Sequence, residues 1–280
     1  MLGRVKRYIK TKLIVYKKVP VVIRIESGKV LENRVAVITG GGSGIGKAIA
    51  KLYLENGAKV IICGRNLKKL EDCIREIGND NTDRLRPYQL NLTDFHTFSD
   101  AVKKMNSIFP EPVSILVNNA GVNSFDSFLN ITADSFDQCM NTNLKGTVLL
   151  SQEVAKQMMA NNVKGNILNI GSSSCFRPAV SSYHMSKWAL RGLTMGMART
   201  LIKHDIVVNG IAPGPTATEM INASDEDLSF KMNPCGRMAV TDEIASMAVK
   251  LVSDSSRLVV GEMVCVTGGS GNLTFDDIGY

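Results

Sequence analysis

The chain has 280 residues, of which 44% are hydrophobic, and a formal net charge of +7. This length and composition allow one α/β domain with a full core, and no apolar run approaches the roughly 18 residues that predict a membrane span. The charge is local, because residues 1–34 hold ten lysines and arginines against two glutamates, so that segment carries +8 and the other 246 residues carry −1. A neutral body with a basic leader argues against a nucleic-acid-binding domain.

Cysteine and histidine usage indicates a compartment and gives no sign of a metal. The six cysteines stand apart, with no C-x-x-C pair, which is typical of reduced thiols in a cytoplasmic protein. The three histidines show no metal-ligand spacing, so we assign no metal site. The first residues lack the uninterrupted apolar core of a secretory signal.

Residues 1–33 are predicted to form a basic N-terminal extension. Apolar residues recur at helical spacing among the lysines and arginines of residues 1–19, which predicts a basic amphipathic helix. Such a helix can make a peripheral contact with an anionic membrane surface, or it can pack on its own domain or on a neighbouring subunit. Pro20 ends this helix, and residues 21–31 read as two short strands about a Ser27-Gly28 turn.

The stretch from Arg34 to Gly46 organises the rest of the chain. An apolar strand over 35–38 leads into a glycine turn and then into a helix over about 45–56. Gly40, Gly44 and Gly46 leave room for a tight turn whose N–H groups can touch a pyrophosphate. Their spacing, G-x-x-x-G-x-G, differs from the more familiar G-x-G-x-x-G. The order of strand, glycine loop and helix predicts the start of a nucleotide-binding βαβ unit.

Strands and helices then alternate along the chain. This alternation implies an α/β fold with a doubly wound parallel sheet covered on both faces. We expect one such domain over 34–269 and a C-terminal tail over 270–280. Further strands are predicted over 59–63, 86–90, 114–117, 165–170, 205–211 and 263–266, and further helices over 67–77, the dozen residues after Asp94, 132–160 and 182–203.

Five ordered motifs resemble those of the short-chain dehydrogenase/reductase family. They are Thr39-Gly-Gly-Gly-Ser-Gly-Ile-Gly46, Asn118-Asn-Ala-Gly121, Tyr183-x-x-x-Lys187, Pro213-Gly214 and Gly268-Gly269. The resemblance implies a Rossmann fold and a nicotinamide dinucleotide, and a homotetramer or dimer joined through helices 132–160 and 182–203. It also implies the cofactor-binding residues, namely Gly40, Ser43, Gly44, Ile45, Gly46, Arg65, Asn91, Leu92, Asn118, Ala120, Gly121, Tyr183, Lys187, Pro213, Gly214, Thr216 and Thr218.

The end of the second strand predicts which dinucleotide binds. NAD users of the family resemble one another in carrying an aspartate there, which bonds the ribose hydroxyls and repels a 2′-phosphate, whereas this chain has Gly64. Arg65 can instead fork onto a phosphate, or it is an ordinary loop arginine. We therefore expect NADP(H) to be preferred over NAD(H). Many NADP-dependent relatives carry a basic residue inside the glycine loop, where this chain has Ser43.

Other cofactor residues follow from the same resemblance. Asn91 and Leu92 resemble the turn beside adenine, and Asn91 either accepts from the exocyclic amine or only forms the turn. Asn118 and its small neighbours resemble the segment that backs the cofactor. Thr218 would bond the carboxamide, and Thr216 would contribute mainly its backbone.

Reducing a ketone requires a hydride donor and a proton source at the carbonyl oxygen. Tyr183 and Lys187 share one helical face, so we expect the ammonium and the nicotinamide cation to lower the pKa of the phenol and Tyr183 to supply the proton. The resemblance implies that Ser172 polarises the substrate oxygen, with Ser173 and Ser174 as the rival candidates.

Three further features bear on the chemistry. Asn143 resembles the helix asparagine that holds a water on a proton relay through Lys187, or else it is a buried asparagine bonded to backbone in a helix bend. Arg177 either meets an anionic substrate group or is a solvated loop arginine. Residues 219–235 occupy the place where relatives carry their substrate lid.

These residues predict NADPH-dependent reduction of a ketone to a secondary alcohol, or the reverse. The nearest resemblance is to 3-oxoacyl-[acyl-carrier-protein] reductases, which implies a carrier-bound acyl chain as substrate, with Lys164 and Lys203 as candidates for docking the acidic carrier near the entrance. Sugar or polyol dehydrogenases are the next resemblance. The alternative from another class is a non-catalytic dinucleotide-binding protein that acts through its basic leader.

Overall fold

The computed structural model describes residues 28–78, 83–218 and 228–274. The helix expected over 1–19 and most of the expected lid lie outside these residues. The prediction of a second strand within residues 21–31 is wrong, because residues 28–33 form a bend and a turn. The turn is closed by the N–H of Glu32, which donates to the carbonyl of Lys29 at 3.0 Å. Leu31 is fully buried, and its N–H donates to Asn56 rather than to a neighbouring strand.

Seven parallel strands form one sheet in the order β3-β2-β1-β4-β5-β6-β7. This order confirms the predicted doubly wound Rossmann-like α/β fold, because the chain reverses its direction of winding between β1 and β4. Ligands of such sheets bind beyond the carboxyl ends of the strands at that point of reversal. The strands are β1 (Val35–Thr39), β2 (Lys59–Gly64), β3 (Leu85–Gln89), β4 (Val113–Asn118), β5 (Gly165–Ile170), β6 (Ile206–Pro213) and β7 (Met263–Val266).

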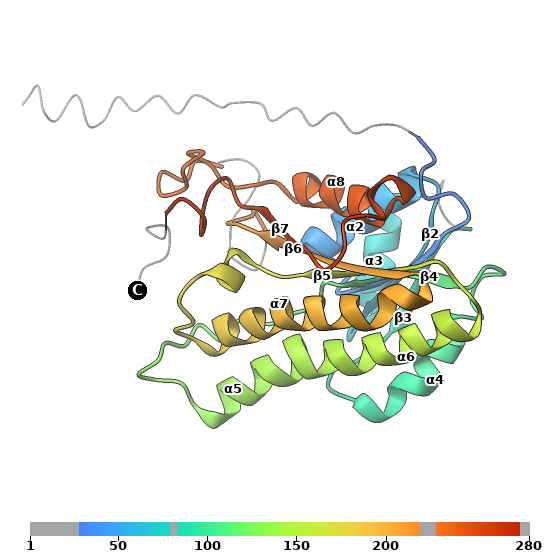
Figure 1. The fold of residues 1–280 in the computed structure, drawn as a ribbon, viewed down its shortest axis with the longest axis horizontal. Helices are drawn as coiled ribbons and strands as arrows, with labels where there is room; N and C mark the ends of the chain where they lie inside the picture. Colours follow the sequence, from blue (N-terminus) through green and yellow to red (C-terminus); the bar gives the residue numbers. More distant parts are fainter. Residues whose placement is uncertain (1–27, 79–82, 219–227, 275–280) are drawn as a thin grey trace, which may run out of the picture.

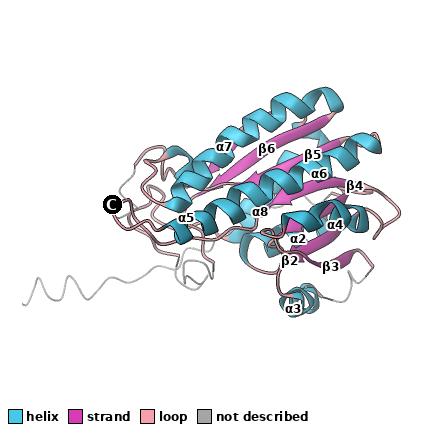
Figure 2. Cartoon of the chain, turned by 90° about the horizontal axis from the view of Figure 1, so that it is seen from below, coloured by secondary structure: helices cyan, strands magenta, loops and turns pink. Residues whose placement is uncertain are grey.

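Helices cover both faces of the sheet (Figure 1). One layer holds α2 (Gly44–Glu55), α3 (Leu67–Ile77) and α8 (Thr241–Val252). The opposite layer holds α4 (Phe98–Met105), α6 (Gly146–Ala160) and α7 (Ser182–Leu201), and Figure 2 shows α6 and α7 running alongside the strands. Within the described ranges, every helix is too short or too polar to cross a bilayer.

The sequence reasoning missed α8. The helix begins with Asp242 and Glu243 in its first turn, and its buried face packs against α2. The hydroxyl of Tyr53 in α2 donates to the carbonyl of Ala248 at 3.2 Å. The apolar spacing from Ile244 to Val252 is helical, so the signal was present in the sequence.

The helix predicted over 132–160 contains a π-helical turn. It begins as α5 (Ala133–Cys139), widens over Met140–Lys145 and continues as α6. Asn143 lies within the wide turn, and its carbonyl accepts from the hydroxyl of Thr147 at 3.0 Å. Such π turns are rare and are frequent at functional sites.

Arg34 joins three strands at the amino ends of the sheet. From the start of β1, its Nε donates to Ser114 Oγ of β4 at 2.9 Å and its Nη2 to Asn166 Oδ1 of β5 at 2.8 Å. The planar guanidinium suits this role because it holds several donors in one plane. Arg34 therefore stabilises the amino ends of these central strands, opposite to the carboxyl ends where ligands are expected.

Candidate active site

The glycine loop between β1 and α2 has the conformation that its sequence predicts. Gly40 and Gly44 have φ angles of +64° and +51°, in the left-handed region that side chains disfavour. A Cβ at Gly46 would lie 2.3 Å from the carbonyl oxygen of Gly40, so only glycine fits there. The loop thus turns tightly off the strand, as a phosphate-binding loop at a helix N-terminus must.

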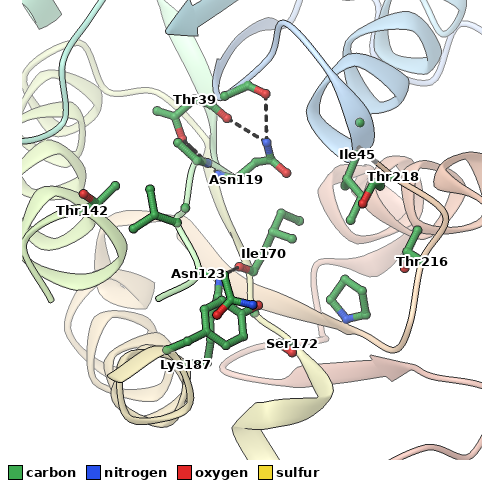
Figure 3. A pocket seen from close by; sticks show the side chains of 18 of the residues that line it. Thr39, Ile45, Asn119, Asn123, Thr142, Ile170, Ser172, Lys187, Thr216 and Thr218 are labelled. Carbon is green, nitrogen blue, oxygen red and sulfur yellow. Dashed lines mark hydrogen bonds between the residues drawn. The ribbon is translucent and has the colours of Figure 1, made fainter. Parts of the chain in front are cut away.

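Asn119 fastens this loop to the end of β4. Its Nδ2 donates to the carbonyls of Thr39 at 3.0 Å and Gly40 at 3.1 Å. In return, Thr39 Oγ1 accepts from the N–H of Asn119 at 3.0 Å and of Ala120 at 3.1 Å (Figure 3). Thr39 and Asn119 were not predicted as site residues, although each stands inside one of the quoted motifs.

A cavity of about 1280 Å³ opens at the carboxyl ends of the strands. It joins the glycine loop to the first turns of α7, so one continuous space serves both expected halves of the site. Most of the predicted residues line it: Gly40, Ser43, Gly44, Ile45, Arg65, Asn91, Leu92, Ala120, Gly121, Ser172, Tyr183, Lys187, Pro213, Gly214, Thr216 and Thr218.

Gly46, Asn118 and Asn143 are predicted site residues that do not line the cavity. Asn118 was expected to back the cofactor, but its Nδ2 donates to Ser151 Oγ at 2.8 Å and to Asn169 Oδ1 at 2.9 Å inside the helix layer. Asn119 lines the cavity in its place. Asn119 follows the last residue of β4, and its side chain is directed to the glycine loop, whereas that of Asn118 contacts α6 and β5.

The loops after β2 and β3 form one end of the cavity. Arg65 is exposed there, and its carbonyl accepts from Gln89 Nε2 at 2.9 Å. Asn91 forms a turn, because its Oδ1 accepts from the N–H of Thr93 at 3.2 Å and from the Thr93 hydroxyl at 3.0 Å. These two contacts are those expected of an asparagine that forms the turn.

Ser172, Tyr183 and Lys187 form a cluster at the other end. Tyr183 is the second residue of α7, and its hydroxyl is hydrogen-bonded to Ser172, which follows β5. Lys187 lies one turn along α7, with its Nζ 5.6 Å from the centre of the Tyr183 ring. That Nζ donates to the carbonyl of Ile170 at 2.9 Å, and Figure 3 shows Lys187, Ile170 and Ser172 around one part of the cavity.

The pKa of Tyr183 differs from the expectation. Burial raises it to about 12, and the interaction with the Ser172 side chain acts in the opposite direction without overcoming burial. Burial also lowers the pKa of Lys187, whose Nζ donates to the carbonyl of Ile170. Tyr183 is therefore protonated at neutral pH and ready to donate.

The three serines after β5 all line the cavity. Ser172 Oγ accepts from the N–H of Ser174 and donates to the hydroxyl of Ser174, each at 3.1 Å. Ser173 and Ser174 are buried, while Ser172 is partly exposed and hydrogen-bonded to Tyr183. The contacts with Tyr183 and Ser174 orient the Ser172 hydroxyl within the cavity.

Asn143 is buried behind the cluster. Its Oδ1 accepts from the N–H of Val122 at 2.8 Å, and its Nδ2 donates to the carbonyl of Val122 at 2.9 Å and to Ser186 Oγ at 3.0 Å. These contacts are those of the second interpretation, a buried asparagine bonded to backbone in a helix bend. A role in a proton relay stays a prediction.

The segment after β6 closes the cavity beside the glycine loop. A Cβ at Gly44 would lie 3.5 Å from Cγ2 of Thr218, so this threonine lies against the loop, and Figure 3 shows it next to Ile45. Thr216 Oγ1 donates to the carbonyl of Gly214 at 3.0 Å, which fixes the turn itself.

Two of the three basic residues considered for carrier or substrate contacts lie away from the cavity. Lys164 directly precedes β5 and Lys203 lies three residues before β6, so both are at the amino ends of the strands, whereas the cavity lies at the carboxyl ends. They are therefore wrong as docking residues near the entrance. Arg177 is 1% exposed, lines the cavity and donates to the hydroxyl of Ser270, so it is not a solvated loop arginine.

Comparisons with known proteins agree with this geometry. A family model described as short chain dehydrogenase matches residues 34–229. The (3R)-3-hydroxyacyl-CoA dehydrogenase of Rattus norvegicus is 30% identical, over 85% of this chain and 96% of that protein. Gluconate 5-dehydrogenase of Gluconobacter oxydans is 32% identical, over 84% and 93%. A structure of 3-ketoacyl-(acyl-carrier-protein) reductase from Brucella melitensis complexed with NADH has a TM-score of 0.77 at 28% identity, over 85% of this chain and 98% of that one. The chain belongs to the short-chain dehydrogenase/reductase family and is an NAD(P)-dependent oxidoreductase that acts between ketones and alcohols.

Proposed function

We propose that Tyr183, Ser172 and Lys187 carry the interconversion of a ketone and a secondary alcohol in this chain. The observation that supports it is the hydrogen bond between Tyr183 and Ser172 in a cavity continuous with the glycine loop, with Lys187 one helical turn away. The alternative of a non-catalytic dinucleotide-binding protein is set aside, because the family is one of enzymes and the serine, tyrosine and lysine are all present.

Each residue has a distinct task. The Ser172 hydroxyl donates to the carbonyl oxygen and polarises it, and the Tyr183 hydroxyl gives that oxygen a proton. The raised pKa of Tyr183, about 12, keeps the phenol protonated at the start of reduction. The buried ammonium of Lys187 stabilises the phenolate that remains, because an opposite charge favours the ionised form.

The residues fit a nicotinamide dinucleotide. The glycines of the loop let the backbone turn tightly from β1 into the N-terminus of α2, whose N–H groups can face a pyrophosphate, and Ala120 and Gly121 line the cavity between its two ends. When bound, the dinucleotide supplies or accepts the hydride. We propose that NADP(H) is preferred, which is supported by Gly64 and Arg65 at the end of β2, where no carboxylate would repel a 2′-phosphate.

The substrate that we propose is a 3-oxoacyl thioester. The relatives named for hydroxyacyl-CoA and ketoacyl-carrier chemistry support this class. A sugar or polyol substrate is the second candidate, supported by the gluconate 5-dehydrogenase relative. A panel of β-ketoacyl thioesters, on coenzyme A and on carrier protein, is compared with keto sugars at saturating NADPH. Turnover of keto sugars alone would exclude the acyl assignment.

Tyr183→Phe tests the mechanism. Loss of a positioned proton donor is expected to lower kcat about 10²- to 10⁴-fold. The dissociation constant of NADPH, measured by fluorescence titration, is expected to stay within about twofold, because the phenylalanine ring keeps the packing. Turnover at the wild-type rate would remove Tyr183 from the mechanism.

A further inference from the structure

The carboxylate of Asp126 contacts the beginning of the helix that carries Tyr183. Asp126 lies in the loop between β4 and α5, and Ser182 is the first residue of α7. The N–H of Ser182 donates to Asp126 Oδ1 at 3.0 Å, and the Ser182 hydroxyl donates to Oδ2 at 2.5 Å. The first N–H groups of a helix have no acceptor within the helix, so this carboxylate supplies one.

The same carboxylate also accepts from its own loop and from α5. Its Oδ1 accepts from the Ser124 hydroxyl at 2.6 Å, and its Oδ2 accepts from the Ser135 hydroxyl at 2.8 Å. Ser135 belongs to the capping box of α5, where its N–H donates to Thr132 Oγ1 at 3.1 Å. Asp126 therefore joins the loop after β4, the start of α5 and the start of α7.

A second contact holds the first turn of α7 from the other side of Tyr183. Asn143 Nδ2 donates to Ser186 Oγ at 3.0 Å, and the Ser186 hydroxyl donates to the carbonyl of Tyr183 at 2.7 Å. Ser182 and Ser186 flank Tyr183 along the helix. The turn that presents the phenol is thus held at both ends, by Asp126 at one and by Asn143 at the other.

The residue before Asp126 has an uncommon backbone conformation. Phe125, directly before Asp126, has a φ of +52°, in the left-handed region that non-glycine residues rarely adopt. Its side chain is exposed, so burial of the ring does not hold this conformation. Burial acts to raise the pKa of Asp126, but its hydrogen bonds from Ser124, Ser182 and Ser135 outweigh burial and lower it to about 2. An ionised carboxylate at a helix N-terminus is also favoured by the helix dipole.

We propose that Asp126 is a positioning residue for Tyr183, fixing the first turn of α7 so that the phenol meets Ser172 before substrate binds. This inference rests on the proposed role of Tyr183. Catalytic groups displaced by about 1 Å can lose roughly 10²-fold in rate, so an anchor of this turn affects turnover without touching substrate.

The test compares Asp126→Ala with Asp126→Asn. The alanine variant is expected to lower kcat between about 10- and 100-fold while the KM for NADPH changes less than about twofold. The asparagine variant is expected to keep kcat within about threefold of wild type, because its oxygen can accept from the Ser182 N–H and its amide can donate to the neighbouring hydroxyls. Asp137→Ala, an exposed carboxylate of α5 with the same change of charge, is the control and should behave as wild type.

Hydrogen–deuterium exchange of a peptide over residues 181–186 gives a readout that does not need activity. Exchange is expected to accelerate in Asp126→Ala and to stay slow in Asp126→Asn and Asp137→Ala. Unchanged exchange and kcat in the alanine variant would overturn the inference, as would an asparagine variant as slow as alanine, since charge rather than geometry would then matter. If Tyr183→Phe turns over normally while exchange still responds to Asp126→Ala, the proposed mechanism fails and the anchoring contact stands.

Discussion

The proposed preference for NADP(H) can be tested at two adjacent residues, Gly64 and Arg65. Arg65→Gln removes the cation that would pair with a 2′-phosphate. A hydrogen bond to a charged group contributes about 1.5–3 kcal/mol, and the exposure of Arg65 places its value near the lower end. Since about 1.4 kcal/mol corresponds to a tenfold change in affinity, NADPH should bind about tenfold more weakly and NADH about equally well.

Gly64→Asp should shift the preference further. A Cβ at Gly64 would lie 3.3 Å from Cδ2 of Leu70, the flexible end of a side chain, so an aspartate fits after a small adjustment. A carboxylate about 4 Å from a phosphate at the protein surface is repelled by about 1–4 kcal/mol, which weakens NADPH binding by about fivefold or more. The same carboxylate can accept from a ribose hydroxyl, so NADH should bind several-fold more tightly.

The measurement is the ratio of the NADPH and NADH dissociation constants, determined by fluorescence titration at fixed ionic strength. Arg75→Gln is the matched control, because Arg75 is an exposed arginine near the end of α3 that pairs with Asp72. The control removes the same charge and should leave the ratio unchanged. If Arg65→Gln weakens both dinucleotides equally, or neither of them, Arg65 does not contact a 2′-phosphate and the reasoning is refuted.

Three further variants test other parts of the structure. Gly46→Ala should weaken NADPH at least about tenfold in the same titration, because the new Cβ would lie 2.3 Å from the Gly40 carbonyl and open the loop; wild-type affinity would contradict this. Arg34→Ala should lower the free energy of unfolding in urea by about 2–4 kcal/mol, since it leaves strand-edge acceptors unpaired, and a loss below about 0.5 kcal/mol would exclude that role. The hydrogen bonds from Arg237 lower the pKa of Glu243, so their contribution is present above about pH 4.3 and is lost as the pH falls through the lowered value. The melting temperature of Glu243→Gln should therefore fall less than that of wild type on acidification. Parallel plots of melting temperature against pH for the two proteins would refute the linkage.

The sheet could be predicted from the sequence because its strands are buried on both faces. Val60, Ile61 and Ile62 of β2 are fully buried, so their apolar run needs no alternation to be recognised. α8 was within reach of the same reasoning, since its first turn is acidic and its apolar spacing is helical. The turn over 28–33 could not be predicted in this way. Leu31 is apolar because it is buried in the core, and an apolar residue at this position is equally typical of a buried strand.

The site residues that can be recognised by their type and spacing were predicted. Those whose role depends on the direction of the side chain were missed. Glycines that turn a loop, and a tyrosine four residues before a lysine, are visible in the sequence. The adjacent residues Asn118 and Asn119 cannot be told apart by type. In the structure, Asn118 at the end of β4 contacts Ser151 of α6, and Asn119 contacts the glycine loop. The raised pKa of Tyr183 depends on burial, and the contact of Lys187 with Ile170 depends on the fold, so neither follows from spacing.

The strand order sets a length scale for whatever fills the cavity. Arg65 follows β2 and Ser172 follows β5, and β1 and β4 lie between them in the sheet. Three strand-to-strand spacings of about 4.8 Å put these two ends about 14 Å apart across the sheet. Only an elongated ligand can therefore reach both ends of the cavity. A half-molecule such as adenosine monophosphate or nicotinamide mononucleotide should reach one end and leave the other exposed to solvent.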